Sequence, residues 1–63
     1  MKLNALICKI KEELEIEEST KMPSAIRKAV EILGLEDACA GFTSLKEKAN
    51  RIAEELDIEE RVV

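Results

Sequence analysis

The side chains of this chain that could take part in chemistry are carboxylates, two cysteines and a few hydroxyl groups. Fourteen residues are Asp or Glu, whereas His, Tyr and Trp do not occur. A catalytic site normally combines a nucleophile with an acid or base whose pKa is tuned by a pocket. Adjacent carboxylates such as Glu12 and Glu13, or Glu54 and Glu55, diverge around a helix instead of converging. The sequence therefore predicts a protein that is not an enzyme and has no small-molecule substrate.

The acidic run of residues 15–18 could supply metal ligands, and the two cysteines could supply ligands or a cross-link. Residues 15–18 have neither the ligand spacing nor the turn glycine of a calcium loop. With no His and two Cys, we expect no metal and no cofactor. Cys8 and Cys39 leave two possibilities open. A disulfide would close a loop of about 30 residues and add about 3 kcal/mol of stability, whereas a reducing compartment would keep two free thiols.

Ser44 invites a comparison with a modified serine. The stretch Gly41-Phe42-Thr43-Ser44-Leu45, followed by Glu54-Glu55-Leu56-Asp57-Ile58, is similar to the modified-serine helix of acyl carrier proteins. In that family a Gly-x-Asp-Ser-Leu stretch presents its serine to phosphopantetheine; here Thr43 stands at the aspartate. The similarity covers residues 41–58 and implies modification at Ser44. Ser44 with Glu47 three residues later also matches a capping box, which begins a helix.

Basic residues near the end of the chain suggest a different alternative. Lys46, Lys48 and Arg51 would lie on the second of two helices joined by a short connection, as on the recognition helix of a helix-turn-helix protein. Neighbouring glutamates offset these charges, and the net charge of −4 has the wrong sign for binding phosphates. We keep a nucleic-acid binder as an alternative but expect no nucleic-acid partner.

The elements that position these residues are three amphipathic helices. Apolar residues at helical spacing predict helices over residues 3–14, from Met22 to a stop at Gly34, and from Thr43 or Ser44 to residue 56. Pro23 suits the first turn of the second helix, and Gly34 suits a left-handed end. Residues 36–41 could form a loop or a single helical turn. We predict an all-α fold, a small three-helix bundle in one domain, residues 1–63.

The three helices resemble one another beyond their apolar period. Aligned on Leu14, Leu33 and Leu56, which are 19 and 23 residues apart, each has a basic residue five positions earlier and a glutamate two positions earlier. An apolar anchor follows two positions later in each, at Ile16, Leu35 and Ile58. The pattern predicts three helix-loop repeats, over residues 3–18, 22–37 and 45–60, with residues 38–41 inserted.

The second helix is apolar over the widest arc. Ala25 and Ile32 lie to one side of its main stripe, and Leu6 occupies the equivalent flank of the first helix. Either the second helix is central and buries both flanks, or Leu6, Ala25 and Ile32 form an interaction surface for a partner helix or a second copy. We therefore expect a non-enzymatic protein–protein interaction or assembly module, a scaffold or an oligomerisation domain.

The chain contains no apolar run near the roughly 18 residues that span a bilayer. Lys9 and Lys11 interrupt the apolar start after a few residues, which is unlike a signal peptide. We expect no membrane partner and an intracellular, cytoplasmic protein.

Overall fold

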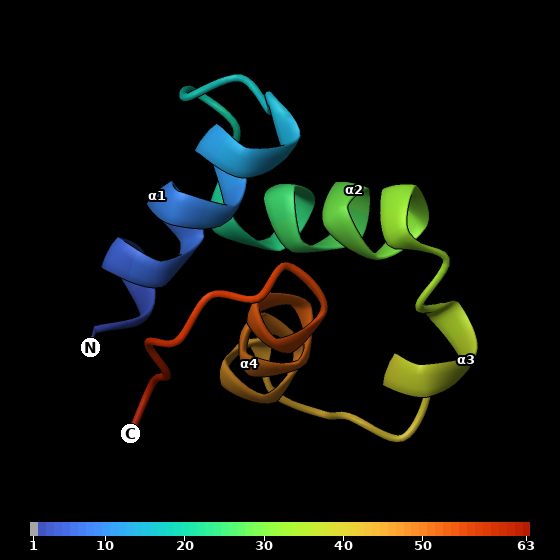
Figure 1. Cartoon of the computed structure of the whole chain (residues 1–63). Coiled ribbons are helices and arrows are strands. Elements are labelled where there is room, and N and C mark those ends of the chain that lie inside the picture. The colour runs from blue at the N-terminus through green and yellow to red at the C-terminus, as the bar shows by residue number, and fades with distance from the viewer. Residues whose placement is uncertain (1) are drawn as a thin grey trace.

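The computed structural model describes residues 2–63, which form four helices and no β-strand (Figure 1). Helix α1 spans Leu3–Leu14, α2 spans Met22–Leu33, α3 spans Glu36–Cys39 and α4 spans Leu45–Glu55. The all-α prediction is confirmed, and the segment left open between loop and helical turn is the short helix α3. Met1, the first residue of the predicted domain, lies outside the described residues. No helix in residues 2–63 combines the length and the apolar character needed to cross a membrane.

The core is built from one stripe of each long helix. The buried stripe residues are Leu6, Ile7 and Ile10 of α1, Ala25, Ile26 and Ala29 of α2, and Ala49, Ile52 and Ala53 of α4. The first helix contributes only large side chains, whereas α2 and α4 contribute two alanines each. Pairing large with small side chains lets helices approach closely and fill the space between them.

Each long helix contacts the other two, and α2 also contacts α3. In an open solenoid, a repeat contacts only its neighbours in the sequence. Here α1 and α4 pack together, so the three long helices close around one core. The second helix contacts each of the other three.

The three long helices end in the same backbone turn. Glu15, Gly34 and Asp57 each adopt a left-handed conformation, with φ of 56°, 64° and 60°. After α1, the N–H of Glu15 bonds to the carbonyl of Glu12, and the N–H of Ile16 bonds to that of Lys11. The equivalent pairs follow α2 and α4. This is the Schellman motif, which satisfies the last carbonyls and turns the following apolar residue onto the helix.

Candidate functional site

A groove lies where α2, α3 and the first turns of α4 meet. It has a volume of about 330 Å³. Buried or partly buried apolar side chains form its floor, namely Ile26, Val30, Cys39 and Leu45. Clefts of this size with apolar walls are large enough to hold a small ligand or the side chains of a partner.

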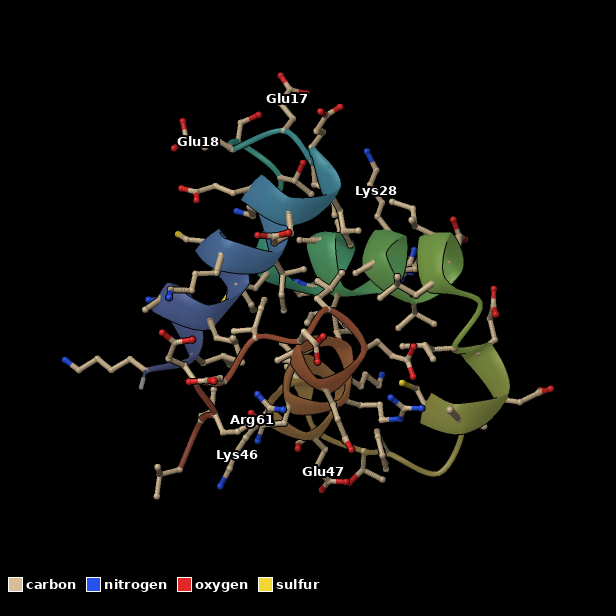
Figure 2. The ribbon with its side chains drawn as sticks, in the orientation of Figure 1. Glu17, Glu18, Lys28, Lys46, Glu47 and Arg61 are labelled. Carbon is tan, nitrogen blue, oxygen red and sulfur yellow. The ribbon has the colours of Figure 1, made fainter. Side chains whose placement is uncertain are left out.

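The groove has charges of both signs at its rim. Arg27 and Lys48 supply two cations, and Glu31 and Glu36 supply two anions. The rim is therefore balanced, although the whole chain has a net charge of −4. Lys28, the neighbour of Arg27, does not line the groove, and Figure 2 shows it on the outer side of α2, away from α4.

The predicted interaction surface is divided by the fold. Leu6 and Ala25 are completely buried, whereas Ile32 is 58% exposed. Leu6 of α1 and Ala25 of α2 therefore belong to the core and cannot form an interaction surface, because the three long helices pack against one another over these flanks. Ile32 remains as one exposed apolar residue, which is ordinary for a protein surface.

The two cysteines are free thiols in the structure, so the proposed disulfide is not found. Cys8 is exposed on α1, whereas Cys39 is buried on α3 and lines the groove beside α2. The two thiols thus face different surroundings, one the solvent and the other the packed side of α2.

Ser44 and Arg51, on which the two alternative functions depend, each have a structural partner. The hydroxyl of Ser44 accepts a hydrogen bond from the N–H of Glu47 at 3.2 Å, as the N-cap of α4. Arg51 donates to Glu55 Oε1 at 2.8 Å, one turn further along the same helix. That bond raises the pKa of the Arg51 guanidinium. Lys46 is exposed and projects outward beside α4 (Figure 2).

A second set of polar contacts holds the segment after α4. Asn50 of α4 donates from Nδ2 to the carbonyl of Val62 at 3.1 Å, and its Oδ1 accepts from the N–H of Val62 at 2.8 Å. Lys9 of α1 donates to Glu60 Oε1 at 2.7 Å. This bond is the largest cause of a pKa of Glu60 below its ordinary value of 4.5. We call residues 58–63 the tail segment; it lies across α1 and α4 (Figure 1).

Sequence reasoning did not identify Asn50 as a functional residue. Asparagine is a poor residue for a helix interior, because its amide competes for main-chain hydrogen bonds. An asparagine within α4, beside the apolar stripe, was the one feature of the sequence that could have indicated a specific role for Asn50. Its partner Val62 is twelve residues away and shows no periodic relation to it.

The described residues 2–63 contain no group of three or more His, Cys, Asp or Glu side chains that could hold a metal ion. No protein-family model matches the chain. No curated protein matches it. No solved structure matches it. The groove and the contacts of the tail segment are therefore interpreted from their own chemistry.

Proposed function

We propose that this protein is a small non-enzymatic protein–protein interaction module that assembles through the groove between α2, α3 and α4. The observation that supports the proposal is the combination of an apolar floor with a charged rim in a groove of about 330 Å³. Apolar pockets bordered by polar groups are the places where an interface concentrates its binding energy. Leu6 and Ala25 cannot contribute to the interaction surface, because both are buried in the core.

The occupant we propose for the groove is a second copy of the chain. A two-fold interface brings the same patch of both copies together, so each residue must meet a complementary one on the partner. Two cations and two anions at the rim satisfy this condition, since Arg27 or Lys48 of one copy can pair with Glu31 or Glu36 of the other. Balanced rims also avoid the repulsion that a net charge of −4 would otherwise cause.

We also infer that the fold is a three-helix bundle of three repeated units, in which α3 belongs to the connection after the second unit. Two features support this inference. The same left-handed turn follows each long helix, at Glu15, Gly34 and Asp57. An apolar anchor follows each turn, and the anchors Ile16, Leu35 and Ile58 all pack on the core. In addition, each long helix has a basic residue and a glutamate at the same two positions before its aligned leucine. Core packing does not require these charged residues, so their recurrence favours repeated units.

Light scattering coupled to size exclusion tests the assembly proposal over a wide range of concentrations. We expect a mass that rises above the 7.1 kDa of one chain as the concentration increases. Arg27→Glu should suppress this rise, because it leaves one cation against three anions at the rim, whereas Lys28→Glu should not. A constant monomer mass, or equal effects of the two substitutions, would contradict the proposal.

The two alternative functions predict different results. A carrier protein would gain the mass of a phosphopantetheine group at Ser44 when incubated with a phosphopantetheinyl transferase and coenzyme A. A nucleic-acid binder would bind duplex DNA with an affinity that falls steeply as salt increases. The assembly module we propose should do neither.

A further inference from the structure

The contacts of the tail segment have the chemistry of peptide recognition. The amide of Asn50 bonds to both main-chain groups of Val62, as a neighbouring strand does in a β-ladder. Main-chain bonds of this kind supply affinity for an extended segment, while side-chain contacts supply specificity. We propose that the face formed by Asn50 of α4 and Lys9 of α1 binds an extended segment of a partner protein, with glutamate two residues before valine.

Two side-chain positions set the specificity. Val62 is partly buried and packs against the core, which favours a β-branched apolar residue at that position. Glu60 accepts from Lys9 at 2.7 Å, which favours a carboxylate two residues earlier. Both partners of that ion pair are close to half exposed, with 45% and 44% of their side-chain surface accessible. The ion pair therefore contributes selectivity, and Asn50 contributes most of the affinity.

The chain's own tail segment occupies this site as an internal ligand. Arg61 donates to the carbonyls of Ile58 and Glu60, and both of these bonds lie within the segment. A short tether gives the segment a high effective concentration, in the millimolar range for flexible linkers. A partner segment must compete with it, so its apparent affinity is lowered by the fraction of molecules in which the site is closed.

The test uses the full chain with its own tail segment weakened. The Val62→Asp chain places a carboxylate where a partly buried valine lies, which should open the site. The probe is a fluorescein-labelled, acetylated and amidated peptide with the sequence of residues 57–63, followed by fluorescence anisotropy. We expect the Val62→Asp chain to bind this peptide at least about tenfold more tightly than the unaltered chain does, because internal competition is removed.

Two further substitutions identify the recognising residues. Adding Asn50→Leu to the Val62→Asp chain should weaken binding about tenfold, because two hydrogen bonds are lost. Adding Asn4→Leu, at an exposed asparagine of α1, should leave binding unchanged. Equal affinities for these two double variants would overturn the proposal. A peptide with Val62→Asp should bind more weakly than the unaltered peptide, because it places a carboxylate where the valine side chain packs.

Folding of the receptor is checked by circular dichroism, and Val62→Gly replaces Val62→Asp if the latter does not fold. Absence of peptide binding by a folded receptor would overturn the proposal. A mixed dimer between the Val62→Asp chain and the unaltered chain that persists when both also carry Arg27→Glu would overturn it too, because assembly through the groove is then suppressed and the occupant would be the tail segment of a second copy.

Discussion

The two segments that return to the core after α2 and α4 place Cys39 and Val62 against it, six residues after Leu33 and Leu56, but have different backbones. After α2 the chain coils into α3 and buries Cys39, whose N–H bonds to the carbonyl of Leu35 at 2.8 Å. After α4 the chain forms neither helix nor strand, and the N–H of Val62 bonds to Asn50 Oδ1 at 2.8 Å. A helical segment satisfies its own main-chain hydrogen bonds, whereas a segment without regular structure needs partners elsewhere. The difference explains why the second return requires a recognising side chain and the first does not.

The largest effect should come from the core on which both returning segments pack. Ile52 is completely buried on α4, so Ile52→Ala should lower the free energy of unfolding by about 2–5 kcal/mol. Leu33→Ala removes a side chain that is only partly buried, and its cost should be smaller. Chemical denaturation measures both values. If the two substitutions lower the free energy of unfolding equally, Leu33 contributes as much to the core as Ile52 does, which would contradict their different burial.

The next largest effect is a difference in stability between substitutions in the two returning segments, at Cys39 and at Val62. Cys39 is 5% exposed, so Cys39→Ser buries a hydroxyl group and should cost about 1–3 kcal/mol in the free energy of unfolding. Val62→Thr makes a similar change at a partly buried site near water, and we expect it to cost less than about 1 kcal/mol. Thermal unfolding of the two variants gives the comparison. A larger cost at Val62 would mean that the tail segment, not α3, is integral to the core.

A smaller effect concerns the left-handed turns that end the long helices and direct the chain back onto the core. A Cβ at Gly34 would meet nothing within 4 Å, so Gly34→Ala should destabilise by about 1 kcal/mol through its φ of 64° alone. Glu15 has a side chain and adopts the same left-handed conformation at a steric cost. Glu15→Gly removes that cost and should raise the free energy of unfolding by about 0.5–1 kcal/mol. Denaturant midpoints report both signs. A loss of stability in Glu15→Gly would show that the glutamate side chain contributes contacts that outweigh the strain.

The smallest effect is the pH dependence of the tail segment. Because the pKa of Glu60 is lowered in the folded protein, its contribution is complete above the ordinary value of 4.5 and is lost as the pH falls through the folded pKa. We expect the tail segment to loosen below about pH 4.5. NMR shifts of Glu60 and Val62 follow this change, and Lys9→Gln should move the titration of Glu60 upward. An unchanged titration in Lys9→Gln would contradict the ion pair.

The helices could be predicted from the sequence because their signals are local. The apolar period identified α1 from residue 3 to residue 14, and Pro23 and Gly34 marked the start and end of α2. Ser44 was identified as the cap of α4 by its spacing to Glu47.

The groove and the tail site depend on contacts that no local pattern encodes. Burial of Leu6 and Ala25 follows from which helices become neighbours, since both residues lie on a flank that could equally have faced solvent. Asn50 and Val62 meet only because the left-handed turn at Asp57 sends the chain back along α4. The sequence does not show that Asp57 adopts a left-handed conformation, because aspartate also occurs in ordinary loops. Glycine favours that conformation, so Gly34 could be identified as a helix end.

The measurement that most directly tests the comparison is amide hydrogen exchange at Val62 and Cys39 in the unaltered, Asn50→Leu and Asn4→Leu chains. We expect Asn50→Leu to increase the exchange rate of the Val62 amide at least about tenfold and to leave that of Cys39 unchanged, because only the tail segment bonds to Asn50. The Asn4→Leu chain should match the unaltered chain at both amides. If the Val62 amide exchanges at the same rate with and without the Asn50 side chain, the tail segment is not held by this residue and the proposed peptide site is wrong.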